Sequence, residues 1–388
     1  MKIREALSYD DVLIAPAGIT EVKSRWDCET KTIIKAGGNM QHYVQPLIAS
    51  PMSTVCDVDM CIEMANNKCI GILHRGHPYE DINNKLDAVQ RIRKALPYGL
   101  FGVAIGSQEK DFEDAKALID AGVEIICVDV ANGHNRYVAR FVEKLKSTIA
   151  KFCHVMAGNV ATADGFKLLA NSGADSVRAG IGGGSVCATS ANTAIGLPTL
   201  QSIIDCAELR DAYHTYSHIA IIADGGAKSS GDVAKAIAAG ADFVMCGSLF
   251  AGTSKSPGEL MWLNKATEQV SKAQPTHRMI LSVPGHINTE TYVVDKTAVQ
   301  VKKYEGMASF NVQVEQGRDE TKIVPEGVST YVKYSGETNE MVKLLLGGLR
   351  SAMSYCNATT LEQFRLNAEF VRVTNAGLAE SKPHSIRL

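Results

Sequence analysis

The chain has 388 residues, of which 45% are hydrophobic, and its 40 lysines and arginines nearly balance 42 aspartates and glutamates, leaving a net charge of −2. This composition is typical of a globular protein with a substantial core, and without a basic excess it argues against a nucleic-acid-binding protein. No apolar run approaches the roughly 18 residues that a membrane span needs, and the start contains no apolar signal segment, so we expect a cytoplasmic protein.

Ten cysteines are scattered along the chain without a CxxC pair or the spacing of zinc ligands. Several lie in apolar runs such as IICVDV (125–130), where cysteine usually behaves as a small buried hydrophobic residue. The cysteines therefore indicate a reducing compartment and no structural zinc site.

Short apolar runs rich in β-branched residues recur along the chain, and each is followed by a stretch that resembles an amphipathic helix, such as 110–123 and 230–241. The runs lie at 46–50, 69–74, 100–106, 124–130, 154–160, 175–181, 218–226 and 242–248. Apolar strands covered by helices indicate a parallel sheet, and eight such units predict an α/β fold of the (β/α)8 TIM-barrel type. The alternative, a doubly wound sheet, typically carries a GxGxxG turn after its first strand, and no such turn follows 46–50.

Residues 252–342 do not fit this repeat, because polar, turn-rich stretches alternate there with β-like ones such as 329–334. A segment of this length predicts a flap or lid inserted after the eighth strand. A helix over 340–355 then completes the barrel wall, and we expect residues 1–388 to form a single catalytic domain.

Small and polar residues end most of the predicted strands. Active sites of TIM barrels form at the carboxyl ends of the strands, so these endings converge on one mouth. They include Ser50, Met52, His74-Arg75, 129–133, Asn159, 180–187, Asp224 and Ser248.

The loop GIGGGSVCATS (180–190) holds four glycines and one cysteine. It is not a Walker loop, since no Gly-Lys-[Ser/Thr] follows, but its backbone N–H groups and Ser185 suit an anion. A plain flexible turn is the alternative for the glycines alone. Cys187 favours a site, because a lone thiol at a barrel mouth is a candidate nucleophile.

The loops after the seventh and eighth strands, 223–226 and 246–250, are the usual phosphate site of this fold. Asp224 is itself an anion and suits ribose hydroxyls instead. Phosphate, diol and thiol together indicate a nucleotide that is attacked on its base. The alternatives are a helix N-cap for Asp224, a simple turn for Ser248, and a non-redox enzyme of small sugar phosphates.

Motifs at these strand ends resemble those of the IMP dehydrogenase/GMP reductase family over nearly the whole chain. The motifs are SYDDVLIAP (8–16), SPMSTV (50–55), DVANGHN (129–135), AGNVATADG (157–165), GIGGGSVC (180–187), IADGG (222–226), CGSLFAGT (246–253), YEGMAS (304–309) and LLGGLRSAMSYC (345–356). The resemblance implies a TIM barrel that assembles as a homotetramer or homo-octamer.

The resemblance also implies a chemistry. Cys187 would attack C2 of a purine nucleoside monophosphate, GMP or IMP, and hydride would pass between C2 and the nicotinamide of NADPH or NAD. Thr189 would handle the proton of the attacking or leaving group.

The resemblance further assigns three sets of binding residues. The substrate-binding set is Ser50, Met52, Asn159, Ser185, Asp224, Gly226, Gly247, Ser248, Tyr304, Gly306 and Met307. The cofactor-binding set is Asp129, Ala131, Asn132, Gly133 and Gly180. A potassium ion would bind the carbonyls of Gly182, Gly184 and Cys187, with Glu380 and Ser381 of a neighbouring subunit's tail.

Several positions depart from the family pattern. Gly183 replaces a usual proline, Ala188 and Ser190 replace the Thr and Arg that flank Thr189, and Ser53 replaces an aspartate. The regulatory CBS module is absent, because 83–106 passes directly from helix to strand. These departures leave a catalytically weak nucleotide-binding relative as one interpretation.

The direction of the reaction depends on the flap. A dehydrogenase must hydrolyse its adduct, and family members use an Arg-Tyr pair for this, whereas here Arg318 precedes Asp319. This deficit favours GMP reductase as the main interpretation. IMP dehydrogenase is the alternative, because Glu326 resembles the dehydrogenase residue that binds purine N1–H, while Phe310 stands where the reductase has the glutamate partner of its threonine. Arg318 would then act alone on water.

Overall fold

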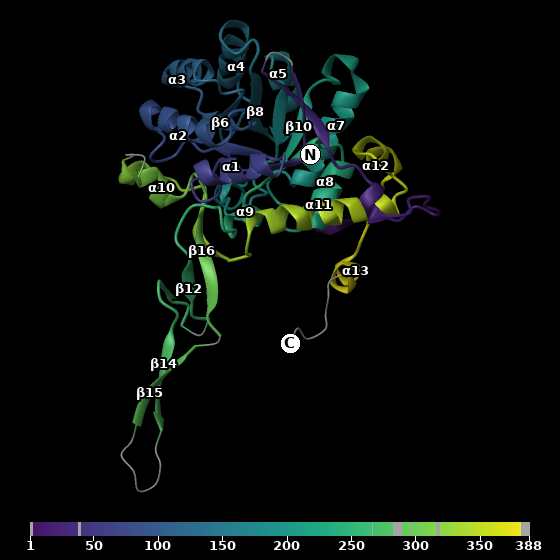
Figure 1. Cartoon of the computed structure of the whole chain (residues 1–388). Coiled ribbons are helices and arrows are strands. Elements are labelled where there is room, and N and C mark those ends of the chain that lie inside the picture. Colours follow the sequence, from purple (N-terminus) through teal and green to yellow (C-terminus); the bar gives the residue numbers. More distant parts are fainter. Residues whose placement is uncertain are drawn as a thin grey trace.

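The computed structural model describes residues 3–37, 40–265, 267–281, 289–295, 297–315 and 319–381. Eight parallel strands close into a barrel in the order β10-β11-β4-β5-β6-β7-β8-β9 (Figure 1). They are β4 (Leu47–Ala49), β5 (Ile70–Leu73), β6 (Gly102–Ile105), β7 (Ile125–Asp129), β8 (His154–Val160), β9 (Ser176–Ala179), β10 (Ala220–Asp224) and β11 (Phe243–Cys246). Each lies within one of the eight apolar runs, so the predicted barrel is confirmed and the doubly wound alternative is wrong.

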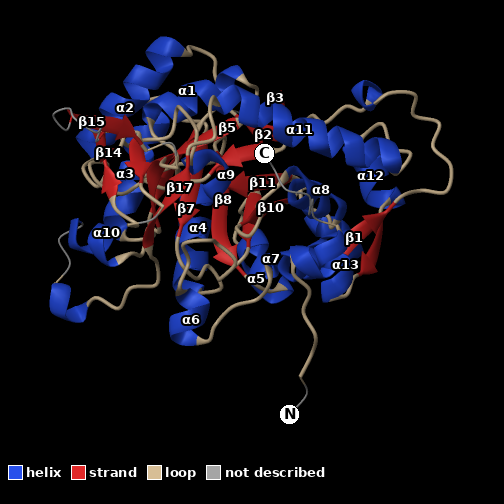
Figure 2. Cartoon of the chain, turned by 90° about the horizontal axis from the view of Figure 1, so that it is seen from below, coloured by secondary structure: helices blue, strands red, loops and turns tan. Residues whose placement is uncertain are grey.

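Helices surround the barrel strands (Figure 2). They are α1 (Val58–Asn66), α2 (Ile82–Ala95), α3 (Glu109–Asp120), α4 (Arg136–Thr148), α5 (Ala163–Asn171), α7 (Thr199–Ala212), α8 (Ser230–Ala238) and α11 (Thr338–Tyr355). Asn135 caps α4 by accepting a hydrogen bond from Tyr137 N–H, and Ser229 caps α8 in the same way. Val138 and Leu145 of α4 are buried on its inner face, as the helical period requires.

Apolar side chains from the barrel strands form a core inside the barrel, and a hairpin packs against this core. The core includes Ile48, Ile70, Ile72, Ile125, Met156, Ile222 and Phe243. The hairpin, β2 (Thr32–Ala36) and β3 (Met40–Val44), packs Ile34 and Val44 against this core. His154 at the start of β8 is buried between them, with its ring nitrogens 2.9 Å from Lys35 O and 2.8 Å from Ser176 Oγ.

We expect the two buried histidines to make the fold acid-sensitive. Burial lowers the pKa of His154, and burial lowers the pKa of His74 to about 4, from an ordinary value of 6.5. Below pH 6.5 these histidines are therefore protonated in the unfolded chain but stay neutral in the folded chain. The free energy of unfolding falls as the pH drops below 6.5, by up to about 1.4 kcal/mol per pH unit for each histidine. Urea unfolding at a series of pH values measures this slope. A His154→Gln chain, which keeps an amide donor and acceptor, should show a shallower slope, and an unchanged slope would contradict the assignment.

The insertion after β11 has its own sheet, with a ribbon that projects from the barrel (Figure 1). The sheet has the order β13-β12-β16-β17, and β14 pairs with β15. The elements are α9 (Ser248–Ala251), β12 (Met261–Leu263), β13 (Val270–Ser271), β14 (Thr276–Leu281), β15 (Thr289–Val294), β16 (Val299–Glu305), α10 (Phe310–Glu315), η4 (Glu320–Lys322) and β17 (Ser329–Lys333). The predicted closing helix is present as α11, beginning at Thr338.

The first and last described segments of the chain contact each other. β1 (Val12–Ala15) pairs antiparallel with β18 (Glu369–Arg372), and α13 (Asn375–Glu380) contacts η1 (Tyr9–Asp11). The remaining elements are η2 (Arg25–Asp27), α6 (Thr189–Thr193), η3 (His214–Tyr216) and α12 (Leu361–Asn367). Among the described residues, none of these helices has the length and apolarity of a membrane span.

Candidate active site

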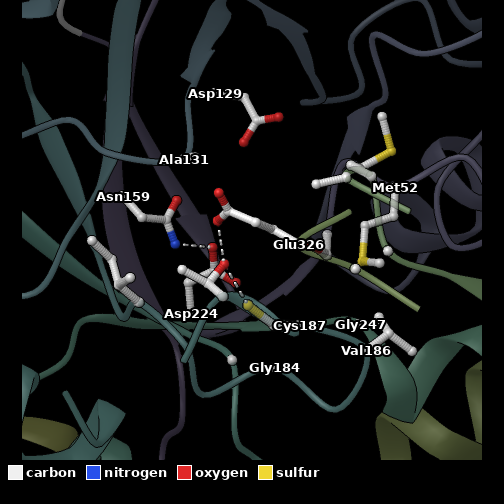
Figure 3. Close-up of a pocket in the computed structure, with 18 of the residues that line it drawn as sticks. Met52, Asp129, Ala131, Asn159, Gly184, Val186, Cys187, Asp224, Gly247 and Glu326 are labelled. Atoms are coloured by element: carbon white, nitrogen blue, oxygen red, sulfur yellow. Dashed lines mark hydrogen bonds between the residues drawn. The ribbon is translucent and has the colours of Figure 1, made fainter. Parts of the chain in front are cut away.

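A cavity of about 500 Å³ opens at the carboxyl ends of the barrel strands (Figure 3). Most residues predicted from the sequence line it. They are Ser50, Met52, Asp129, Ala131, Asn159, Gly180, Gly182, Gly184, Cys187, Thr189, Asp224, Gly247, Tyr304, Gly306, Met307 and Glu326. The strand ends and the base of the insertion thus bring together residues that lie up to 276 positions apart, from Ser50 to Glu326.

Other predicted residues do not line the cavity. Ser185 is exposed and hydrogen-bonds the Tyr304 hydroxyl, while Gly226 and Ser248 directly follow residues that do line it. Asn132 and Gly133 lie on the loop after β7, beyond the lining residue Ala131. Glu380 ends α13 and Ser381 follows it, both on the outside of this chain's barrel. Arg318 lies outside the described residues.

Cys187, Thr189 and Glu326 form a hydrogen-bonded chain. The Cys187 thiol donates to Thr189 Oγ1 at 3.3 Å, and Thr189 Oγ1 donates to Glu326 Oε2 at 2.8 Å. Cys187 is exposed, whereas the nine other cysteines are buried. A thiol next to a hydroxyl that is itself held by a carboxylate has an acceptor for its proton, which is what an activated nucleophile needs.

Backbone pairing fixes Glu326 in this position. Ala188 N–H donates to Glu326 O at 2.7 Å, and Val328 N–H donates to Val186 O at 3.0 Å. Gly327 lies so close to the segment 306–309 that a Cβ there would be 2.9 Å from Ser309 N. Backbone hydrogen bonds therefore hold the loop that carries Cys187 against the segment that carries Glu326, in addition to the side-chain bond from Thr189.

This arrangement corrects one inference from the sequence. Phe310 suggested that Thr189 lacks a glutamate partner, but Glu326 takes that place. The partner comes from the return segment before β17, and not from the residue after GMAS (306–309), so motif spacing alone misplaced it.

Asp224 ends β10 and binds two neighbours through one oxygen. Its Oδ2 accepts from Asn159 Nδ2 at 2.8 Å and from Arg178 Nη2 at 2.7 Å. The N-cap of the following helix α8 is Ser229. The interpretation of Asp224 as a helix cap is therefore wrong.

Two arginines also line the cavity: Arg75, which the sequence placed among the strand endings at the mouth, and Arg178, which it did not assign to the site. Arg178 Nη1 donates to Asp129 Oδ1 at 2.6 Å, and Arg75 Nε donates to Asp129 Oδ2 at 3.3 Å. Burial opposes the ionisation of Asp129, but the two guanidinium groups outweigh it and hold the pKa of this carboxyl below its ordinary value. A charged residue inside the apolar run 175–181 was the signal that could have identified Arg178.

The loops after β10 and β11, where the sequence predicts a phosphate site, are built from close backbone approaches. Gly225 has φ +93° and Gly226 has φ +83°, a conformation that side chains rarely adopt. A Cβ at Gly247 would lie 2.6 Å from the Tyr304 hydroxyl, so glycine lets Tyr304 close over this loop. Burial raises the pKa of Tyr304 to about 12, which keeps its hydroxyl a hydrogen-bond donor.

The glycine-rich loop accommodates its unusual serine. Ser190 Oγ donates to Ile195 O at 3.1 Å and directly faces Gly182 and Gly196, where any Cβ would collide with it.

Among the described residues no group of three His, Cys, Asp or Glu side chains could hold a metal ion. The Gly184 carbonyl accepts from Cys187 N–H at 3.1 Å, and the predicted potassium site stays a prediction.

Comparison with known proteins identifies the family of the chain. The family model described as "IMP dehydrogenase / GMP reductase domain" matches residues 6–275 and 282–384. Inosine-5'-monophosphate dehydrogenase of Bacillus subtilis is 33% identical over 396 residues, covering 100% of this chain and 67% of the relative. The dehydrogenase of Nitrosopumilus maritimus is 34% identical over 319 residues (80% and 59%), and GMP reductase of Leishmania major is 34% identical over 315 residues (82% and 55%). The chain thus spans about half to two thirds of the length of these relatives, and it belongs to the IMP dehydrogenase/GMP reductase family.

Proposed function

We propose that this chain is an NAD-dependent IMP dehydrogenase that converts IMP, NAD and water to XMP and NADH through an adduct on Cys187. The sequence favoured GMP reductase, but the comparisons favour the alternative, because two relatives that align over the whole chain are both named dehydrogenases. Assembly as a homotetramer or homo-octamer, potassium binding and a cytoplasmic location stay predictions.

The hydrogen-bonded chain from Cys187 through Thr189 to Glu326 carries this proposal. The sequence-based objection to a dehydrogenase was the missing Arg-Tyr pair that activates water. A carboxylate behind a hydroxyl, next to the nucleophile, provides another general base for the same step.

The steps balance with these residues. Cys187 loses its proton toward Thr189 and Glu326 and adds through sulfur to C2 of IMP. Hydride then leaves C2, which yields a thioimidate on Cys187. Glu326 passes the thiol proton to solvent before hydrolysis. Water then attacks C2 and gives one proton through Thr189 to Glu326 and the other to N3 of the purine. The C–S bond breaks to release XMP, and Glu326 returns its proton to the thiolate of Cys187.

A nicotinamide dinucleotide, when bound, accepts the hydride. The cavity suits such a group on the side away from the phosphate loops, where Asp129 provides an acceptor for ribose hydroxyls. Arg75 provides a cation there, with 35% of its side chain exposed. Ala131, two residues after Asp129, also lines the cavity and adds no bulky side chain there.

GMP reductase is the second candidate, since the Thr189–Glu326 pair can also protonate departing ammonia. The Leishmania major relative carries that name. The test follows absorbance of the reduced nicotinamide with IMP plus NAD and, separately, with GMP plus NADPH. We expect NADH formation with IMP. Oxidation of NADPH by GMP alone would establish the reductase, and thermal stabilisation by IMP without turnover in either assay would indicate a binding relative.

A further inference from the structure

Arg178 is a buried cation that joins two acidic residues of the site. It lies on β9 with 4% of its surface exposed. Its Nε and Nη2 donate to Asp224 Oδ2 at 3.1 and 2.7 Å, and its Nη1 donates to Asp129 Oδ1 at 2.6 Å. Both arms of one rigid guanidinium are thus occupied, each by a different carboxylate.

The two carboxylates belong to different sides of the barrel. Asp224 ends β10, beside β9 and β11, whose following loops form the thiol and phosphate side. Asp129 ends β7, which lies opposite β11 in the closed ring, and its second partner Arg75 follows β5. Arg178 therefore spans from the nucleotide side to the dinucleotide side.

A glycine makes this span possible. β8 lies between β7 and β9, and Gly158 of β8 pairs with Arg178. A Cβ at Gly158 would be 2.5 Å from Arg178 Cβ and 2.9 Å from Arg178 O. Any side chain at this position would displace the arginine from its path to Asp129.

The hydrogen bonds from Arg178 also determine which carboxylate oxygens of Asp224 and Asp129 remain to accept hydrogen bonds from ligands. Within the described chain, the hydrogen bonds to Asp224 converge on Oδ2, from Arg178 and from Asn159. This leaves Oδ1 of a cavity-lining carboxylate for ribose hydroxyls. On Asp129, Arg178 holds Oδ1, while the longer bond to Oδ2 comes from the partly exposed Arg75, which a ligand can displace.

We propose that Arg178 is a positioning residue shared by both substrates, which aims Asp224 at the nucleotide ribose and Asp129 at the dinucleotide. This inference rests on the proposed function. Removing the guanidinium leaves two carboxylates, whose side chains are only 16% and 13% exposed, with no shared cation, so each turns toward water and away from its ligand. A lysine keeps the charge but lacks the fork that serves both partners at once.

The test compares Michaelis constants in the full chain. Arg178→Lys should raise KM for IMP and KM for NAD together, each by about tenfold. Asp224→Asn should raise KM for IMP alone, and Asp129→Asn should raise KM for NAD alone. In the Asp129→Asn background, Arg178→Lys should no longer change KM for NAD, because the arginine acts on that ligand through Asp129.

Arg210 provides the matched control. It is another buried arginine, on α7, that binds two carboxylates, Asp211 and Asp242, away from the cavity. Arg210→Lys should lower the melting temperature and leave both KM values unchanged. A rise in only one KM for Arg178→Lys, or a lower melting temperature with both KM values unchanged, would overturn the proposal.

Binding measurements separate the two proposals. If the unmodified chain binds IMP and NAD but oxidises no IMP, the proposed function fails. Dissociation constants of the same variants for IMP and NAD, measured by calorimetry, then decide the role of Arg178. If the chain turns over IMP but Arg178→Lys weakens only one ligand, the proposed function stands and the shared role of Arg178 is wrong. If the chain binds neither ligand, both fail.

Discussion

The Cys187→Ala chain should bind IMP with near-normal affinity and lose turnover by about 10³-fold or more. Its sulfur forms the only covalent bond between the chain and the purine in the proposed steps, so no other group of the site can replace it as the nucleophile. The other residues of the site stay in place, because the hydrogen bonds that hold Glu326 to this loop come from the backbone of Ala188 and Val328. Calorimetry with IMP and a steady-state assay at the NADH band measure the two quantities.

A buried cysteine gives the control for this variant. Cys206→Ala on α7 should retain activity, since Cys206 is buried away from the cavity. In the native chain, iodoacetamide should modify Cys187 first, because the nine other thiols are buried, and IMP should protect it. Turnover retained by Cys187→Ala would rule out the covalent route.

The barrel was predictable because its signal is local and repeated. Each strand is a short apolar run bounded by polar residues, and even β4, with three residues, falls inside the run 46–50. The insertion was predictable only as a break in this repeat. Its strands pair across turns of variable length, so no period shows that β12 joins β16 or that β17 closes the sheet.

The site was predictable where a residue acts from its own loop, as Cys187 does. It was not predictable where a partner arrives from another segment. Glu326 reaches Thr189 across 137 positions, and the pairing depends on backbone bonds that leave no mark in the side-chain pattern. Arg178 was missed although a charged residue within an apolar run was a visible signal, because the two carboxylates that it binds come from other strands.

Glu326→Gln should lower kcat with IMP by about 10² to 10³-fold while leaving the first hydride transfer intact. The amide can still hold Thr189 by a hydrogen bond, but it cannot take a proton from water. The thiol of Cys187 is exposed and can lose its proton directly to solvent. The adduct therefore still forms and gives up its hydride, and then accumulates because hydrolysis is slow. A stopped-flow trace should show a burst of one NADH per chain followed by a slow phase, and intact-mass measurement after acid quenching should show the nucleotide bound to Cys187.

Glu320→Gln is the matched control, because Glu320 lies exposed on η4 in the same return segment, away from the cavity. It should leave kcat unchanged. Loss of the burst together with kcat would show that solvent cannot replace Glu326 in the deprotonation of the thiol, and an unchanged kcat would remove Glu326 from the reaction. The same variant also separates the two directions: in a reductase, ammonia must leave before hydride arrives, so Glu326→Gln would oxidise no NADPH even in the first turnover with GMP.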